Sequence, residues 1–254
     1  MAEAIDPGVE GALATRRSVR GFTPAPVGEA TVRHILALAA RAPSMTNTQP
    51  WRVHVLTGAP LARLSEACRQ AHRDGRHWDA EYDYYPAEWT EPFVGRRRQI
   101  GWALYGLLGI GKGDRVASSR QHERNYGFFG APVGMILTTA RVLRTGSYID
   151  LGMFLQSVTI AARGYGLDTC PQAAFAFMHP IIREQLGLPE SEIVVCGMAL
   201  GHIDPTEKAN ELRTVREDVD AFAVFLGDDQ LPPDLMMGAA RGVDPRVKPG
   251  DDVL

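Results

Sequence analysis

Residues 42–51 read A-P-S-M-T-N-T-Q-P-W, and they carry far more hydrogen-bonding groups than a simple connector needs. An amphipathic run at 32–40 precedes them and an apolar, β-branched run at 53–56 follows, which predicts a loop between a helix and a strand. Asn47 and Gln49 each offer amide donors and an acceptor, which suits the edge of a flat polar heterocycle. A polar turn without a ligand explains the same residues, and the stretch alone does not separate the two interpretations.

The segments on both sides of this loop predict a mixture of helices and strands. The run at 32–40 keeps apolar residues at helical spacing, and Glu29 or Thr31 can begin that helix. Further helices are predicted at 10–16, 60–71, 99–110, 150–163 and 181–186, and strands or extended segments at 53–56, 133–138, 168–177 and 193–200. The helices at 99–110 and 150–163 are rich in apolar residues, which predicts that both are buried. This order indicates an α+β fold around one small sheet.

Composition narrows the class of protein. The chain has 254 residues, of which 45% are hydrophobic and 22% are charged, as in globular proteins with a sizeable core. The formal net charge of −3 gives no electrostatic reason to expect nucleic acid or an anionic membrane as a partner. No apolar run reaches the roughly 18 residues of a spanning helix. We expect one domain at 1–227 and a largely disordered tail at 228–254, which is rich in Asp, Pro and Gly.

The cysteines and histidines argue against a metal site. Three cysteines, Cys68, Cys170 and Cys196, are widely spaced without a C-x-x-C pair, and the histidines lack the spacing of metal ligands. Neither a disulfide framework nor a bound metal is expected, and a reducing cytoplasm fits this pattern best. Residues 1–15 contain acids but no lysine or arginine, unlike a secretory signal.

A basic cluster at 15–22, T-R-R-S-V-R-G-F, is the second stretch with chemical potential. Arg16, Arg17 and Arg20 surround the hydroxyl-bearing residue Ser18. Because arginine presents a planar fork of donors that matches a phosphate, this cluster is a candidate phosphate site. A solvated basic face is the alternative, and it is the more common explanation for a run of charges.

Residues 72–99 mix aromatic and charged residues without a clean period, and their aromatic members are Trp78, Tyr82, Tyr84, Tyr85 and Trp89. Such aromatics either pack as a satellite of the core or line a ligand cleft, and both interpretations remain open. The glycine-rich dinucleotide fingerprint, the phosphate loop and the G-x-S-x-G elbow are absent. The basic cluster, the amide-rich loop and the aromatic segment together suit a phosphate-bearing aromatic cofactor, which would supply the chemistry while the protein supplies position and electrostatics.

The two N-terminal motifs resemble a known family. R-R-S-V-R-G-F at 16–22, followed by A-P-S-M-T-N-T-Q-P-W at 42–51, is similar to the paired signature of the FMN-dependent nitroreductases. The resemblance continues with F-G-A-P-V at 129–133 and L-G-L-P at 186–189, and it covers roughly residues 13–225. The Y-D-Y-Y-P and R-R-R elements look most like the branch that reduces nitrobenzoates and dinitroaniline-type compounds. The resemblance implies a small, mostly antiparallel central sheet flanked by helices, and a homodimer with active sites at the subunit interface and each C-terminal arm swapped onto the partner.

The resemblance also implies roles for individual residues. FMN would be held by Arg16, Ser18 and Arg20, with Arg17 adjoining, and would be covered from the other subunit by Pro43, Ser44, Met45, Asn47 and Gln49. Where the family often has P-x-E-G-F, this chain has P-Q-A-A-F at 171–175, so the segment Pro171, Gln172 and Ala173 keeps a backbone donor for the flavin but no carboxylate. Arg213 is the candidate for the FMN phosphate. The substrate side would be lined by Tyr84, Tyr85, Trp89 and Phe128.

The implied reaction is a ping-pong cycle. NADH or NADPH gives a hydride to flavin N5 and leaves, and a nitroaromatic then takes two electrons in the same place. Water can deliver the protons, so no catalytic side chain is assigned. The same flavin site would also serve a quinone, a flavin or a halogenated aromatic as acceptor, and a flavin-binding protein without turnover is the alternative from another class.

Overall fold

The structure, a computed structural model, describes residues 8–227 in two units, 8–212 and 213–227. The tail predicted at 228–254 lies outside the described residues. The second unit has one short 3-10 helix, Val219–Ala221, and none of its described residues is buried. Six apolar side chains are more than half exposed there, namely Val215, Val219, Phe222, Val224, Phe225 and Leu226. This segment therefore has no core of its own.

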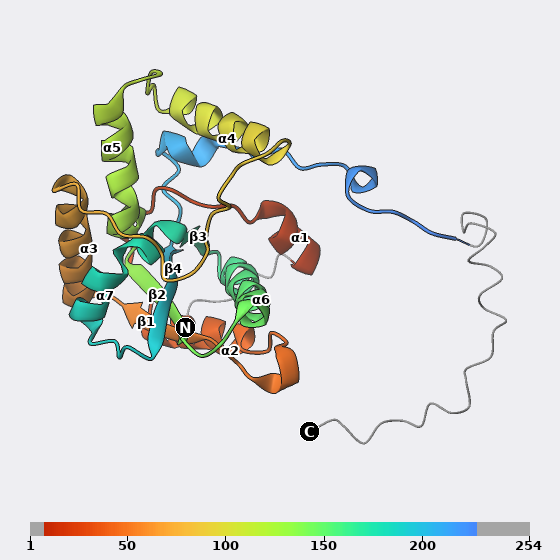
Figure 1. The fold of residues 1–254 in the computed structure, drawn as a ribbon, viewed down its shortest axis with the longest axis horizontal. Coiled ribbons are helices and arrows are strands. Elements are labelled where there is room, and N and C mark those ends of the chain that lie inside the picture. The colour runs from red at the N-terminus through yellow and green to blue at the C-terminus, as the bar shows by residue number, and fades with distance from the viewer. Residues whose placement is uncertain (1–7, 228–254) are drawn as a thin grey trace. The chain divides into compact units, whose positions relative to one another are not determined.

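The larger unit is built on one four-stranded sheet (Figure 1). Its strands are β1 (Arg52–Leu56), β2 (Val133–Ala140), β3 (Asp168–Gln172) and β4 (Glu192–Gly201), in the order β1-β2-β4-β3. Each neighbouring pair is antiparallel. The small antiparallel sheet predicted by the sequence is thereby confirmed, and β1 and β3 are its outer strands.

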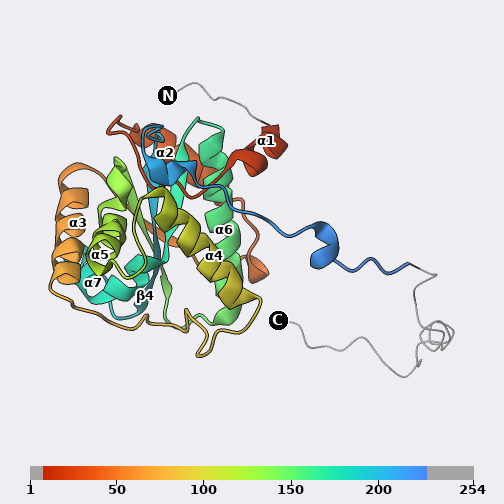
Figure 2. The ribbon, with the colours of Figure 1, turned by 90° about the horizontal axis from the view of Figure 1, so that it is seen from above.

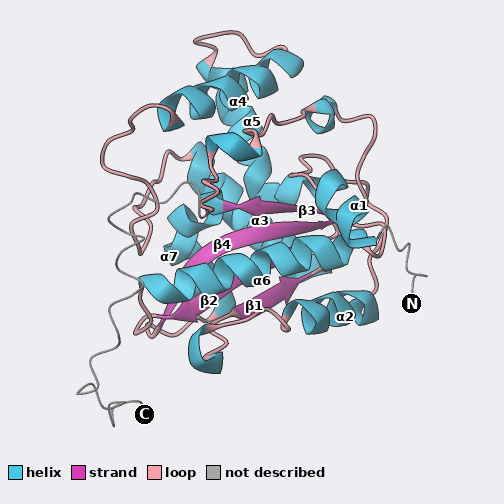
Figure 3. Cartoon of the chain, turned by 90° about the vertical axis from the view of Figure 1, so that its right-hand side faces the viewer, coloured by secondary structure: helices cyan, strands magenta, loops and turns pink. Residues whose placement is uncertain are grey.

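Helices cover both faces of the sheet. The α-helices of the larger unit are α1 (Gly8–Thr15), α2 (Glu29–Ala39), α3 (Gly58–Arg73), α4 (Phe93–Leu107), α5 (Arg115–Glu123), α6 (Thr145–Arg163) and α7 (His179–Leu186). Figure 3 shows α2 and α6 in front of the sheet, and Figure 2 shows α3, α5 and α7 together on the other side of β4. The fold is thus a three-layer arrangement, with a hydrophobic core on each side of the sheet.

The two cores arise because the side chains of each strand point alternately to the two faces of the sheet. On β2, Met135 and Leu137 pack with α2 and α6, whereas Ile136 packs with α3 and α7, because successive side chains of a strand point to opposite faces. All of β4 is buried, which agrees with its continuous apolar sequence. The prediction of a buried helix near 150–163 is confirmed by α6, whose inward face includes Leu151 and Phe154.

The prediction for the other apolar helix was wrong. The segment predicted at 99–110 belongs to α4, which starts earlier, at Phe93, and has no buried residue. Trp102 is 69% exposed and Phe93 is 55% exposed, and Figure 3 shows α4 standing apart from the sheet. Apolar residues all around a helix indicate that it favours burial. They do not tell whether its own chain or another chain packs against it.

Candidate functional site

The basic cluster lies along the outer edge of β3. Ser18 forms a parallel bridge with Thr169, and the backbone N–H of Val19 donates to the carbonyl of Thr169 at 3.0 Å. Alternation along this extended segment sends Val19 into the core, where it is fully buried, and leaves Ser18 and Arg20 half-buried. The structure therefore fixes the backbone of the cluster while its hydroxyl and its cations remain accessible.

A buried asparagine holds the same segment from the C-terminal side. Asn210 is 6% exposed, accepts a hydrogen bond from the backbone N–H of Arg20 at 2.7 Å and donates to the carbonyl of Gly21 at 2.8 Å. The approach is so close that a Cβ atom on Gly21 would lie 2.2 Å from Cγ of Glu207. The sequence analysis missed both Asn210 and this use of Gly21, because neither lies within a local pattern.

The charges of the cluster act on two groups of β3. Burial raises the pKa of the Cys170 thiol to about 11, and the positive charges of Arg20 and Arg16 oppose that rise. Burial likewise raises the pKa of Asp168, against the opposing charges of Arg163 and Arg17. Arginine side chains thus lie near β3, and Arg163 pairs with Asp168 at 3.0 Å. Arg16 and Arg20 have no ion pair among the described residues, so this edge of the sheet is electropositive and can attract a phosphate.

The segment 171–173 continues from β3 past this cluster. Pro171 is exposed at the sheet edge, whereas Gln172 is 2% exposed and donates from Nε2 to the carbonyl of Asn125 at 2.7 Å. Ala173 begins the 3-10 helix Ala173–Met178. Because the side chain of Gln172 is held in the interior, this segment can offer a ligand chiefly its backbone.

The amide-rich loop has a strained and anchored backbone. Thr46, Asn47 and Gln49 have φ values of 45°, 59° and 47°, a region that costs free energy for residues other than glycine. The backbone N–H of Met45 donates to Asp150 Oδ2 at 3.3 Å, and that of Gln49 donates to Ser44 Oγ at 3.0 Å. The loop nevertheless presents Pro43, Met45, Asn47 and Gln49 as exposed residues. Within the described residues, no hydrogen bond or ion pair joins it to Arg16, Ser18 or Arg20.

The aromatic segment forms a cluster beside the helix that follows β3. Phe177, which the sequence analysis did not single out, stacks on Tyr85 with ring centroids 5.8 Å apart and meets Tyr84 edge-on at 5.8 Å. Tyr85 also contacts Trp89, at 6.0 Å. Phe177 lies on Ala173–Met178, so three of the four predicted substrate residues gather a few residues beyond the predicted flavin segment. We call Tyr84, Tyr85, Trp89 and Phe177 the aromatic cluster.

Phe128 lies elsewhere. It is fully buried in the core between the sheet and α3 and stacks on Phe175 with centroids 4.5 Å apart. A side chain without accessible surface cannot meet a substrate, so Phe128 is a core residue and is not part of the candidate site. Arg213 begins the second unit. Among the described residues there is no cluster of His, Cys, Asp and Glu that could hold a metal ion, and no helix is long and apolar enough to span a membrane.

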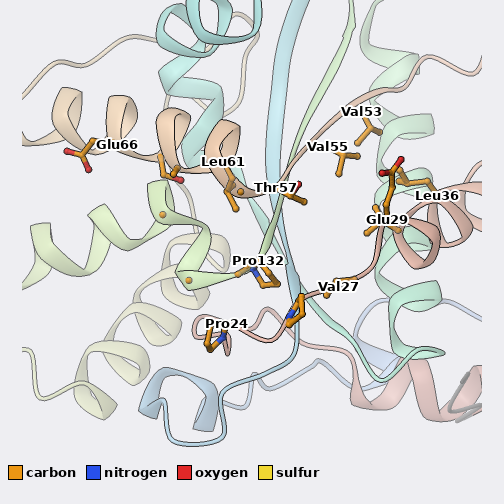
Figure 4. Close-up of a pocket in the computed structure, with 18 of the residues that line it drawn as sticks. Pro24, Val27, Glu29, Leu36, Val53, Val55, Thr57, Leu61, Glu66 and Pro132 are labelled. Carbon is orange, nitrogen blue, oxygen red and sulfur yellow. The ribbon is translucent and has the colours of Figure 1, made fainter. Parts of the chain in front are cut away.

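A groove of about 1180 Å³ runs along the outer edge of β1 (Figure 4). Val53 and Val55 of β1 lie in it between Leu36 of α2 and Leu61 of α3, and Pro132 also lines it. None of the residues predicted to hold a cofactor lines this groove. It is therefore a feature separate from the basic cluster, and it leaves the edge of β1 accessible.

Comparisons with known proteins agree with this geometry. The model of the Nitroreductase family matches residues 13–202. A 4-nitrobenzoate reductase of Nocardioides sp. (strain LMS-CY) is 42% identical over 89% of this chain and 92% of its own length. A chloronitrobenzene nitroreductase of Comamonas testosteroni is 38% identical over 87% and 97%. The FMN and NADPH-dependent nitroreductase NfnB of Sphigopyxis sp. strain HMH superimposes with a TM-score of 0.82 at 37% identity, over 87% of this chain and 99% of that structure.

The chain thus has an α+β fold like that of the solved nitroreductase NfnB. The chain belongs to the nitroreductase family, as the match over residues 13–202 and the relatives above 30% identity establish.

Proposed function

We propose that this protein is an FMN-dependent oxidoreductase that uses NADPH or NADH to reduce nitroaromatic compounds. The observation that carries the proposal is the basic, hydroxyl-bearing segment Arg16–Arg20 fixed along the edge of β3, in a chain whose relatives are nitroarene reductases. The solved relative named as FMN- and NADPH-dependent supports the choice of cofactor and reductant.

The residues at the edge of β3 fit FMN by their chemistry. A phosphate monoester carries about −1.5 to −2 charges at neutral pH, and arginine and serine side chains are its usual donors. Arg16, Ser18 and Arg20 supply such donors on a backbone that Asn210 and Thr169 hold in place. When bound, FMN would supply the hydride acceptance and the electron delivery. The chain would bind and orient it, and Ala173 offers no carboxylate, so protons would come from water.

The partner in this proposal is a second copy of the chain. The loop at 43–49 keeps a strained, exposed conformation, and no hydrogen bond or ion pair in the described part of the chain joins it to Arg16, Ser18 or Arg20. This supports its use on the flavin of the other subunit. The exposed apolar residues of α4, such as Trp102, need cover from another chain. Three free, buried cysteines support a place in the reducing cytoplasm.

The C-terminal arm, residues 213–227, is proposed to cross to the partner and to add a strand at the edge of β1. The opposite outer strand, β3, already pairs with Ser18 and Val19, whereas β1 is open to the apolar groove. The arm carries alternating apolar residues, Phe222, Val224 and Leu226, which are exposed in the single chain. An added strand would satisfy the edge groups of β1 and bury both surfaces.

Two charge substitutions test this arrangement. Val55→Asp in the groove and Phe222→Asp in the arm should each shift the protein from dimer towards monomer in sedimentation equilibrium, because a charge would have to be buried. Val142→Asp, at a turn residue that is 78% exposed, is the matched control and should leave the dimer intact. A dimer that tolerates both test substitutions would place the arm elsewhere.

Absorbance and steady-state kinetics test the activity. The purified protein, loaded with FMN, should show the flavin bands and should oxidise NADPH or NADH faster when 4-nitrobenzoate or nitrobenzene is added. A colourless preparation that binds no added FMN would overturn the proposal. Bound FMN with reductant oxidation by a quinone but not by a nitroarene would assign another acceptor, and bound FMN without turnover would indicate a flavin-binding protein.

A further inference from the structure

One arginine of α4 has a setting unlike that of its neighbours. The guanidinium of Arg97 lies over the ring of Trp89, 4.8 Å from its centroid, and over the ring of Tyr85 at 5.3 Å. Within the described residues Arg97 forms no ion pair with an acid. Its side chain is exposed, so its charge is held in place by two aromatic faces while its donors stay available to a ligand.

These two rings belong to the aromatic cluster. Tyr85 stacks on Phe177, and Phe177 follows the predicted flavin segment on the same 3-10 helix. Tyr84 meets Tyr85 edge-on, with centroids 4.6 Å apart. Burial raises the pKa of Tyr84, so its phenol stays protonated at neutral pH and remains a hydrogen-bond donor. An aromatic surface, a phenol donor and an accessible guanidinium therefore lie together.

We propose that Arg97, stacked on Tyr85 and Trp89, is a specificity-determining residue that binds the carboxylate of a nitrobenzoate-type substrate. The proposal rests on the proposed function, and it names the acceptor class of that site. A benzoate has two recognisable parts, a flat ring and a planar anion. The aromatic cluster offers ring faces for the first, and a guanidinium can donate two parallel hydrogen bonds to the second.

The stacking explains why an exposed arginine can contribute. An isolated surface ion pair stabilises little, because two flexible side chains must be ordered and water screens the charges. Contact with two rings restricts the Arg97 side chain before a ligand arrives, so less conformational entropy is lost on binding. A neutral nitroarene lacks the carboxylate and gains nothing from this contact, so Arg97 should sort acceptors by charge.

The test uses the FMN-loaded protein and two pairs of ligands. Benzoate and benzamide, which are not reduced, are titrated by tryptophan fluorescence, and kcat/KM is measured for 4-nitrobenzoate and nitrobenzene. Arg97→Ala should weaken benzoate binding and lower kcat/KM for 4-nitrobenzoate by about tenfold or more, while benzamide binding and kcat/KM for nitrobenzene stay within about twofold. Arg97→Lys keeps the charge but loses the planar fork, and it should fall between the two.

Arg98→Ala is the matched control, because it removes the same charge from the same helix turn, and no ring contact involves Arg98 in the described part of the chain. It should leave the preference for the carboxylate unchanged. Equal losses in Arg97→Ala and Arg98→Ala, or unchanged benzoate binding in Arg97→Ala, would overturn the inference. If the wild type reduces neither nitroarene, the proposed function fails, and the benzoate titration still decides the role of Arg97. If it reduces both and Arg97→Ala keeps the preference, only this inference fails.

Discussion

At the scale of single residues, glycine is required where a neighbouring group packs so close to the backbone that no room is left for a Cβ atom. Gly197 on β4 faces Phe175 so closely that an added Cβ atom would lie 2.2 Å from the ring. Both residues are in the buried centre of the protein, where side chains cannot yield without moving their neighbours. Gly152 on α6 is exposed and has nothing within 4 Å of an added Cβ.

We therefore predict opposite effects from two glycine-to-alanine substitutions. Gly197→Ala should lower the free energy of unfolding by roughly 1–3 kcal/mol through overpacking. Gly152→Ala should raise it by up to about 1 kcal/mol, because alanine favours a helix over glycine. Urea denaturation followed by circular dichroism measures both. A Gly197→Ala protein as stable as the wild type would mean that Phe175 can move away at little cost.

The assignment of Arg213 to the FMN phosphate rests on the family resemblance in the sequence alone. If it holds the phosphate of FMN, Arg213→Ala should weaken FMN binding by roughly 1.5–3 kcal/mol, the range for a hydrogen bond to a charged group, without unfolding the protein. Flavin fluorescence titration measures the affinity. Unchanged affinity would direct attention to Lys208, which lies on the 3-10 helix Lys208–Glu211 within the larger unit.

At the scale of elements, one carboxylate fastens the aromatic segment to the sheet. The side chain of Glu81 is 8% exposed and accepts hydrogen bonds from Arg141 at 2.5 Å, from Arg183 at 2.9 Å and from the backbone N–H of Val194 at 3.0 Å. The next residue, Tyr82, donates to the carbonyl of Val195 at 2.7 Å. These bonds tie the residues before the aromatic cluster to β4.

The pKa of Glu81 makes this fastening sensitive to acid. Burial alone would raise that pKa, but the hydrogen bonds from Arg141 and Val194, with the charges of His179 and Arg183, outweigh burial and lower it. A carboxyl whose pKa is lower in the folded state stabilises the fold above its unfolded pKa of about 4.3, and that contribution is lost as the pH falls through the folded value.

Glu81→Gln should consequently be less stable than the wild type at pH 7, by about 1.5–3 kcal/mol, and this difference should shrink as the pH falls from about 5 towards 3. Urea denaturation at a series of pH values measures it. Glu88→Gln, in the same segment but exposed, should show no such pH-dependent difference. A constant difference for Glu81→Gln would exclude a charged Glu81 as its source.

At the scale of the whole molecule, the proposed active site needs two chains. Arg20 would serve the flavin from one subunit and Asn47 from the other. Each homodimer of Arg20→Ala or of Asn47→Ala then has two impaired sites, whereas a heterodimer places both lesions on one site and leaves the other intact.

Co-expression of the two variants should therefore restore clear NAD(P)H-dependent nitroarene reduction, to about half of the wild-type activity per heterodimer if the two sites act independently. A mixture of the separately purified variants is the control, and it should stay inactive as long as subunits do not exchange. Heterodimers that are demonstrably formed yet inactive would mean that both segments serve the flavin of their own chain.

Much of the fold follows from local patterns in the sequence. The apolar, β-branched run at 53–56, the apolar run at 193–200 and the helical spacing at 32–40 correspond to β1, β4 and α2, because side-chain pattern and backbone geometry are coupled over a few residues. The family signature at 16–22 and 42–51 likewise lies within short stretches. Local sequence therefore determined these three elements, the family and the chemical character of the basic cluster.

Only the tertiary structure decided which distant residues meet. It brought Asn210 onto the backbone of Arg20 and Gly21, placed Phe128 in the core and Phe177 beside Tyr85, and left α4 exposed. Hydrogen bonds and ring contacts between segments far apart in the chain depend on the three-dimensional path between them, which no local period encodes. The sequence shows that α4 is apolar. Whether a helix is buried depends on what packs against it, and only the tertiary structure decides that.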